Sequence, residues 1–317
     1  MLEVFADYRI GGEPRYYVAD NKDVLMQVPD EVRKCVLFIC CQSPDRLELL
    51  GTAFLVAEPI ENTDYIFPYI VTAKHLIEDV RRYGIDEKVY LRVNQRDGNF
   101  RFIATDIKSW IFHPDDPFVD VAVLPLVLPA ELDYRAFPIA GAVTKGRIPN
   151  LGIGVGDEIF LVGLFIYHAG TGKNIPIIRV GNIAAMPEEP VQTAKGLMDA
   201  YLIEVRSIGG LSGSPVFVHL PPVRFHEDRP KFLQRDYFYL LGLIYGHYWD
   251  LPESASDATL GEDALKETIN TGIAIVIPAS KIIEIINQPE LNQLKEKRRE
   301  EIIKQTLPVE DTNRRPT

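Results

Sequence analysis

Short apolar segments, separated by Gly, Pro, Asp and Asn, recur along most of this 317-residue chain. Apolar runs bounded by turn-forming residues predict β-strands. In the first half the predicted strands are Cys35–Cys41, Gly51–Val56, Tyr69–Thr72, Lys88–Val93, Asn99–Ile103, Ile107–Phe112 and Val119–Leu124. In the second half they are Glu158–Leu164, Ile175–Val180, Leu202–Val205, Pro215–Val218, Tyr237–Tyr245 and Gly272–Ile277. Each half thus has roughly six strands, at the spacing typical of a small barrel or sandwich.

The two strand-rich halves, residues 35–128 and 157–278, are joined by a Pro- and Gly-containing connection over 129–156. Residues 1–34 form an N-terminal extension, and Leu220–Arg235 and Trp249–Glu267 are predicted to be surface insertions. Within 279–305, Ser280 is expected to cap a helix that starts at Lys281 and ends before Pro289. A second, charged helix is expected over Glu290–Gln305, followed by a disordered tail over 306–317.

Charge and composition exclude several classes of partner. The net charge of −11 and the pI near 5.1 argue against general nucleic-acid binding and against an anionic membrane surface, because both need a basic protein surface. No segment approaches the ~20 apolar residues that span a bilayer. The N-terminus has no signal-peptide pattern. The three cysteines, Cys35, Cys40 and Cys41, are odd in number and clustered, which favours buried thiols over disulfides and indicates a reducing, cytoplasmic location.

Three short segments carry residues suited to acyl transfer, which needs a hydroxyl, a base beside it and a group that orients the base. Ser212 lies in the glycine-flanked segment Gly209–Pro215, where glycines allow the tight turn that exposes a nucleophile. His75 follows the strand that ends near Thr72. Asp120 begins an apolar run, where a buried carboxylate needs a partner such as an imidazole N–H.

These segments resemble the motifs of chymotrypsin-like serine proteases. Val71-Thr72-Ala73-Lys74-His75 is similar to V-T-A-x-H, and Asp120-Val121-Ala122-Val123-Leu124 to the segment that carries the orienting Asp. Gly210-Leu211-Ser212-Gly213-Ser214-Pro215 is similar to the loop that carries the nucleophile, in the family's order His, Asp, Ser. Further similarity, to the HtrA-type and glutamyl-endopeptidase branches, extends over roughly residues 35–287 and includes Gly51–Val56, Gly156–Gly163 and Leu241–Gly246.

The resemblance implies an all-β fold of two six-stranded antiparallel barrels with C-terminal α-helices. It implies a catalytic triad of Ser212, His75 and Asp120, and an oxyanion hole formed by the N–H groups of Gly210 and Ser212. Leu211 stands where secreted digestive members have Asp, and the chain lacks their freed N-terminus and their disulfides, so zymogen activation of that kind is not expected. Ile244 stands where the glutamyl-endopeptidases have His, so their selectivity is not carried over.

Four further residues are candidates for substrate binding. The strand that contains Tyr245, Gly246 and His247 resembles the substrate-side wall of the family, and Arg206 precedes the nucleophile where the family builds its specificity pocket. Arg206 either favours an acidic or polar side chain of the substrate, or points to solvent or pairs with Glu204.

The sequence therefore predicts a serine endopeptidase that acts on a protein or peptide, with no metal and no organic cofactor. The alternative is a protease-like fold with a silent or partner-activated site that serves binding or signalling; an esterase or acyltransferase on the same scaffold is a third reading. Because an unrestrained cytoplasmic protease would be hazardous, we expect the C-terminal helices or a partner protein to regulate access.

Overall fold

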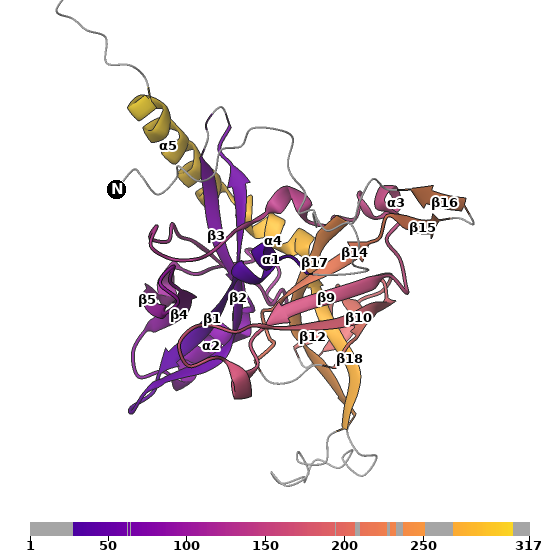
Figure 1. The fold of residues 1–317 in the computed structure, drawn as a ribbon, viewed down its shortest axis with the longest axis horizontal. Helices are drawn as coiled ribbons and strands as arrows, with labels where there is room; N and C mark the ends of the chain where they lie inside the picture. Colours follow the sequence, from indigo (N-terminus) through magenta and orange to yellow (C-terminus); the bar gives the residue numbers. More distant parts are fainter. Residues whose placement is uncertain are drawn as a thin grey trace, which may run out of the picture.

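In the computed structural model, residues 28–61, 63, 65–193, 195–206, 210–226, 229–232, 237–250 and 269–306 are described. Two β-rich halves lie side by side, and two helices follow them at the C-terminus (Figure 1). The all-β fold predicted from the sequence is confirmed. Residues 1–27 of the predicted extension over 1–34 lie outside the described residues, as do most of the predicted insertion Trp249–Glu267 and the tail after residue 306.

The first half is a barrel-like antiparallel sheet with the order β5-β4-β1-β2-β3-β7-β6, and β8 pairs in parallel with β2. Its six longer strands are β1 (Val36–Gln42), β2 (Leu47–Pro59), β3 (Ile66–Thr72), β4 (Lys88–Asn94), β5 (Phe100–Asp106) and β7 (Ala122–Pro125). Two-residue strands β6 (Ile111–Phe112) and β8 (Phe137–Pro138) extend it. Helix α1 (Asp30–Lys34) precedes the sheet, and α2 (Lys74–Tyr83) follows β3.

The second half is a closed six-stranded barrel with the order β10-β13-β18-β17-β14-β9. Its strands are β9 (Glu158–Gly163), β10 (Ile177–Ala185), β13 (Tyr201–Glu204), β14 (Pro215–Leu220), β17 (Tyr237–Asp250) and β18 (Ile269–Pro278). Closure leaves the barrel without unpaired edges along most of its length. Helix α3 (Ile148–Leu151) lies in the connection between the halves.

Alternating side chains on β14 explain why the halves pack together. Val216 and Val218 point into the core of the second barrel, whereas Phe217 between them belongs to the core of the first half. Phe217 stacks on Phe160 at 5.2 Å between ring centroids and meets Phe137 of β8 at 5.1 Å. Both faces of this strand are therefore buried, which accounts for its apolar run from Pro215 to Val218.

Hydrogen bonds between β4 and the loop that joins β9 to β10 also hold the two halves together. The buried Arg92 of β4 donates to the carbonyls of Ala169 and Gly170 in the loop between β9 and β10, at 3.4 and 2.7 Å. Asn174 of the same loop donates its side-chain amide to the Arg92 carbonyl at 2.7 Å and its backbone N–H to Asn94. The loop is thus fixed to the first half near its middle and near its C-terminal end.

Several details differ from the sequence predictions. Residues 107–112 form a 3-10 turn, η2 (Ile107–Ser109), and then β6, because the Asp106 carboxylate accepts the N–H of Lys108 and turns the chain. Two hairpins were not predicted: β11–β12 (Val191–Thr193 and Gly196–Met198) and β15–β16 (Val223–His226 and Arg229–Phe232). The second lies in the predicted insertion Leu220–Arg235 and is held by the buried Arg224, which pairs with Asp157 at 2.9 Å.

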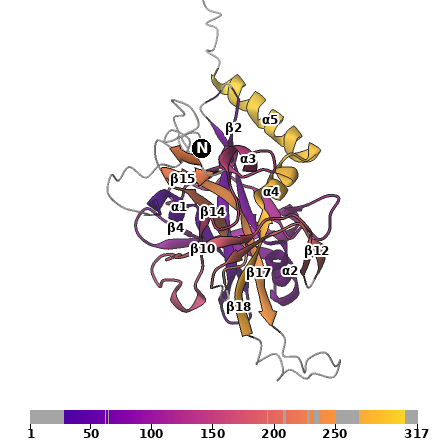
Figure 2. The ribbon, with the colours of Figure 1, turned by 90° about the vertical axis from the view of Figure 1, so that its right-hand side faces the viewer.

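The C-terminal helices are α4 (Ala279–Ile286) and α5 (Pro289–Thr306), seen side-on in Figure 2. The predicted cap at Ser280 is wrong: Pro278 at the end of β18 is the N-cap residue, and no side chain caps the helix. Helix α4 buries Ile282, Ile285 and Ile286. None of the helices within the described part of the chain has the length and apolar character needed to cross a membrane.

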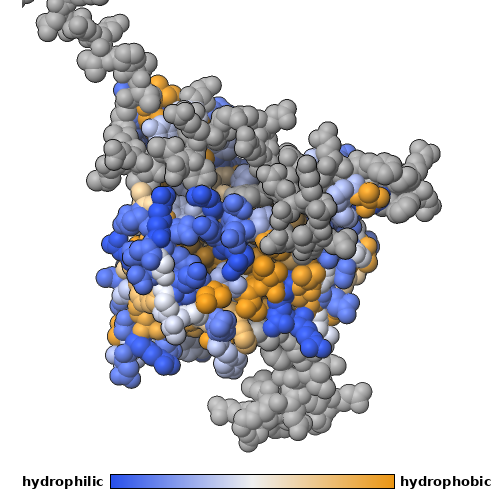
Figure 3. Space-filling model, in the orientation of Figure 1, coloured by the Kyte–Doolittle hydropathy of each residue, from blue (hydrophilic) through white to orange (hydrophobic). Residues whose placement is uncertain are grey.

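Apolar side chains also gather on the face that Figure 3 presents, where β9 and β10 lie. In β10 the side chains of Ile178 and Val180 are exposed, and Tyr167 of the loop before β10 is 84% exposed.

Candidate active site

His75 lies in the first turn of α2, directly after β3 ends. Its backbone N–H, which has no acceptor inside the helix, donates to Oδ1 of Asp120 at 2.8 Å. Its ring Nδ1 lies 2.5 Å from Oδ2 of the same carboxylate. One carboxylate therefore fixes both the start of the helix and the orientation of the imidazole.

Asp120 lies two residues before β7, and its backbone carbonyl accepts the N–H of Lys74 at 3.2 Å. The side chain is fully buried. Burial alone would favour the neutral acid, but the hydrogen bonds and charge of His75 and the charge of Lys195 outweigh it and hold the pKa of Asp120 below its ordinary value. The carboxylate is therefore ionised and accepts the Nδ1 proton of His75, which leaves Nε2 as the basic nitrogen.

Ser212 lies on a tight loop between Gly210 and Ser214. Gly210 and Gly213 have φ values of +95° and +78°, a region that other residues rarely adopt. A Cβ on Gly213 would lie 2.2 Å from the Thr52 carbonyl oxygen, so the loop is pressed against β2. The N–H of Thr52 donates to the Ser212 carbonyl at 3.0 Å, and the N–H of Gly213 donates to Ile244 of β17 at 2.8 Å.

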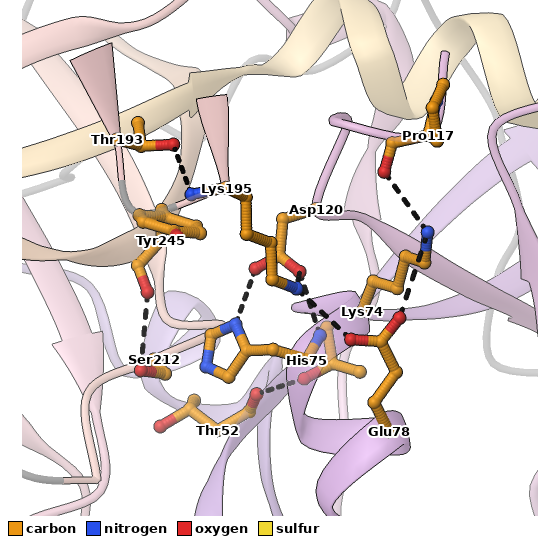
Figure 4. Close-up of polar contacts among 11 residues, drawn as sticks. Thr52, Lys74, His75, Glu78, Pro117, Asp120, Thr193, Lys195, Ser212 and Tyr245 are labelled. Atoms are coloured by element: carbon orange, nitrogen blue, oxygen red, sulfur yellow. Dashed lines mark hydrogen bonds and ion pairs between the residues drawn. The ribbon is translucent and has the colours of Figure 1, made fainter. Parts of the chain in front are cut away.

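The His75 ring lies between Asp120 and Ser212 (Figure 4). The structure thus brings together the three residues that the sequence singled out from positions far apart in the chain. The Ser212 hydroxyl donates a long 3.4 Å hydrogen bond to the Tyr245 carbonyl. Among the described contacts, no hydrogen bond joins Ser212 to His75.

Thr52 anchors the predicted oxyanion site. Its hydroxyl donates to the Gly210 carbonyl and accepts the N–H of Leu164, both at 2.9 Å. Its carbonyl accepts the hydroxyl of Thr72 at 2.7 Å. Among the described hydrogen bonds, none has the backbone N–H of Gly210 or Ser212 as its donor.

The predicted substrate-side residues lie on β17 and after β13. Tyr245 is half-buried, and its ring meets that of His75 edge-on at 5.9 Å. A Cβ on Gly246 would have no neighbour within 4 Å. His247 pairs with Ala274 of β18, and its side chain lies outside the described residues. Arg206 is exposed, and no ion pair with Glu204 occurs among the described contacts.

The free edge of β17 lies beside the nucleophile. Strand β14 pairs with β17 only as far as Leu243, whereas β18 continues along the other edge to Asp250. From Tyr245 onward, one edge of β17 therefore has no neighbouring strand in the described sheet. An extended peptide can add to such an edge.

Sequence reasoning missed Lys195, which contacts the Asp120 carboxylate from the unpredicted β11–β12 hairpin. Thr52 lies in the predicted strand Gly51–Val56, but nothing in the sequence indicated its role. No short motif marks either residue, because both act through contacts with distant parts of the chain. Among the described residues, no group of three or more His, Cys, Asp or Glu side chains is placed to hold a metal ion.

The order of the strands, the closed second barrel and the position of His75, Asp120 and Ser212 between the halves agree with the family resemblance. The chain has a trypsin-like double-barrel fold. No protein-family model and no curated protein matches the sequence.

Solved structures that are similar to this chain include the following two. The MamO protease domain from Magnetospirillum magneticum, in its apo form, matches with a TM-score of 0.47 and 13% identity over 81% of this chain and 98% of its own. Rv3671c from M. tuberculosis H37Rv, a serine-to-alanine mutant in an inactive form, matches with a TM-score of 0.36 and 14% identity over 80% of this chain and 87% of its own. Likenesses at these levels assign no activity, so the function follows only from this chain's own residues.

Proposed function

We propose that this protein is a serine endopeptidase that hydrolyses peptide bonds through an acyl-enzyme. The observation that carries the proposal is the pair of contacts from Asp120 to His75, with Ser212 on the opposite side of the imidazole. A buried, ionised carboxylate that orients a histidine beside a serine on a tight loop is the arrangement that acyl transfer requires.

In the proposed reaction, His75 takes the Ser212 proton through Nε2 as the serine oxygen bonds to the scissile carbonyl carbon. The N–H groups of Gly210 and Ser212 stabilise the oxyanion. His75 then gives its proton to the leaving amine as the peptide C–N bond breaks. Water attacks the acyl-enzyme by the same route, which releases the acid product and restores the serine.

The proposed substrate is an extended segment of a protein or peptide that pairs with the free edge of β17. Tyr245, Gly246 and His247 then contact its backbone, and the open space at Gly246 accommodates that approach. Arg206, which is exposed beside the loop, is a candidate for contact with an acidic or polar side chain. We also propose a reducing, cytoplasmic location, which the three buried free cysteines support.

A second candidate function is a protease-fold module whose site is silent until a partner binds. The observation that favours it is the Ser212 hydroxyl, which points to the Tyr245 carbonyl rather than to His75. In this case the partner would rotate the serine side chain or shift the loop, and C-terminal helix α5 offers one surface for such regulation.

Labelling with a fluorophosphonate probe separates the two candidates. An active peptidase should be labelled stoichiometrically, with labelling lost in Ser212→Ala and His75→Ala, and the wild type should cleave casein or a peptide library. Folded wild-type protein that is neither labelled nor able to cleave would contradict the first proposal. Labelling that appears only after addition of a partner or an extended peptide would support the second.

A further inference from the structure

Lys195 brings a positive charge to Oδ1 of Asp120, the carboxylate oxygen that also accepts the His75 backbone N–H. Its Nζ lies 3.3 Å from Oδ1 of Asp120 and 3.1 Å from a carboxylate oxygen of Glu78 on α2. Figure 4 shows the lysine side chain reaching from the hairpin toward both carboxylates. Lys195 belongs to the second half of the chain, whereas its two partners belong to the first.

The hairpin holds the lysine in this position. The Thr193 hydroxyl donates to the Gly196 carbonyl at 2.8 Å and accepts the N–H of Lys195 at 3.2 Å. Gly196 has a φ of +124° and packs against Phe118, two residues before Asp120: a Cβ at Gly196 would lie 3.0 Å from the Phe118 ring. These contacts fix the backbone of the turn, which directs the Lys195 side chain toward the carboxylate of Asp120.

We propose that Lys195 is a positioning residue of the triad, which fixes the Asp120 carboxylate and sets how strongly the His75–Asp120 pair holds a proton. The proposal rests on the proposed function for its link to rate, but the contact itself does not depend on catalysis. Oδ1 of Asp120 accepts from both the His75 backbone and Lys195, which leaves Oδ2 to the imidazole.

The electrostatic consequence has a definite sign. A cation beside Asp120 offsets part of the negative charge that would otherwise stabilise a protonated imidazole. Lys195 therefore makes the pair release its proton at lower pH than it would without the lysine. Burial lowers the pKa of Lys195, but Asp120 and Glu78 outweigh this and raise it above its ordinary value, so the lysine stays charged throughout the relevant range.

Other groups around the pair constrain the test. Besides His75 and Asp120 themselves, the charged and titratable side chains around the pair are Lys74 and Glu78 from α2, Lys195 from the hairpin, and Tyr245 from β17. Glu78 shares the charge of Lys195 with Asp120, so its removal should leave more of that charge acting on Asp120. The two changes should therefore shift the pH dependence in opposite directions.

The test compares Lys195→Met, Lys195→Arg and Glu78→Gln with the wild type. In Lys195→Met the acid limb of the probe-labelling profile should move to higher pH by about half to one pH unit, which lowers the labelling rate on that limb by about three- to tenfold. Lys195→Arg should restore most of the profile, and Glu78→Gln should move the limb to lower pH. Lys145→Met, which removes an exposed lysine paired with Asp199, is the matched control and should leave the profile unchanged.

A second readout keeps the inference testable if the wild type is not labelled. The 15N chemical shifts of the His75 ring report its tautomer and its protonation over the same pH range. The proposal requires that they change in Lys195→Met and return in Lys195→Arg, whatever the activity. Ring shifts that titrate identically in wild type and Lys195→Met would overturn it, whereas absent labelling with a Lys195-dependent titration would contradict only the proposed peptidase activity.

Discussion

The hydroxyl of Thr52 and the carbonyl of Gly210 form a 2.9 Å hydrogen bond that joins the first half of the molecule to the loop carrying Ser212. Thr52 is fully buried, and its backbone N–H holds the Ser212 carbonyl as well. A residue of β2 therefore positions both the serine and the glycine proposed to bind the oxyanion. This relationship explains how a loop rich in glycine keeps one conformation.

Replacement of Thr52 by Val should weaken this anchor without changing the shape of the side chain. The Gly210 carbonyl and the Leu164 N–H would lose their partner, at a cost of about 1–3 kcal/mol in the free energy of unfolding. Thr105→Val is the matched control, because the Thr105 hydroxyl also makes two buried hydrogen bonds but only within the first half. Urea denaturation should show both losses, whereas only Thr52→Val should slow probe labelling; equal labelling rates would show that the anchor does not position the site.

Gly213→Ala should disrupt the nucleophile loop. Alanine at a positive φ costs about 1–2 kcal/mol, and at Gly213 its Cβ would also overlap the Thr52 carbonyl. Gly98→Ala provides the control, since Gly98 has a similar φ of +88° but open space around it. Thermal unfolding should show a small loss for Gly98→Ala and a larger one for Gly213→Ala, together with loss of labelling. A Gly213→Ala protein as stable and as reactive as Gly98→Ala would contradict the described loop geometry.

Asp120→Asn tests the orientation of His75. The amide retains the shape of the carboxylate but presents an N–H where the imidazole proton must be accepted, and it also loses the attraction to Lys195. By analogy with serine hydrolases in general, the rate of cleavage or labelling should fall about 10⁴-fold. Asp199→Asn, which removes a surface carboxylate paired with Lys145, should have no such effect. Comparable rates for the two variants would remove Asp120 from the proposed mechanism.

Alkaline pH should destabilise the folded protein through Cys40. Burial raises the pKa of this thiol from 9.0 to about 12, although the charge of Arg92 acts in the opposite direction. Between these values the unfolded chain loses a proton that the folded protein keeps, so stability present below pH 9.0 is lost as pH rises, by about 1.4 kcal/mol per pH unit at most. The free energy of unfolding of Cys40→Ala, measured over the same range, should fall less steeply. Parallel slopes would show that Cys40 is not responsible.

The sequence was most informative where local pattern and burial agree. Apolar runs predicted the strands of the second barrel, and Pro289 marked the boundary before the charged helix α5. The fold class was predicted from these patterns together with the family resemblance. The cap predicted at Ser280 failed because β18 continues to Pro278 and the helix begins immediately after it. The hairpins β11–β12 and β15–β16 were missed because each of their strands is only three or four residues long.

The residues of the candidate site also differ in whether the sequence alone reveals them. His75, Asp120 and Ser212 stand in recognisable segments, and the structure places them together, while their catalytic roles stay predictions. Lys195 and Thr52 could not be assigned from the sequence, since their partners lie 75 and 158 positions away. Contacts of that range depend on how the two halves pack, which local patterns do not encode.

The attachment of the Ser212 loop to β2 also bears on how the protein is made. During synthesis the strand that carries Thr52, together with His75 and Asp120, leaves the ribosome well before the serine. The loop has its remaining anchor, Ile244, only once β17 has been added and has paired. A nascent or prematurely terminated chain that lacks β17 therefore contains His75 and Asp120 but lacks the contact that Ile244 makes with the Ser212 loop, so the proposed activity should first arise in the finished chain.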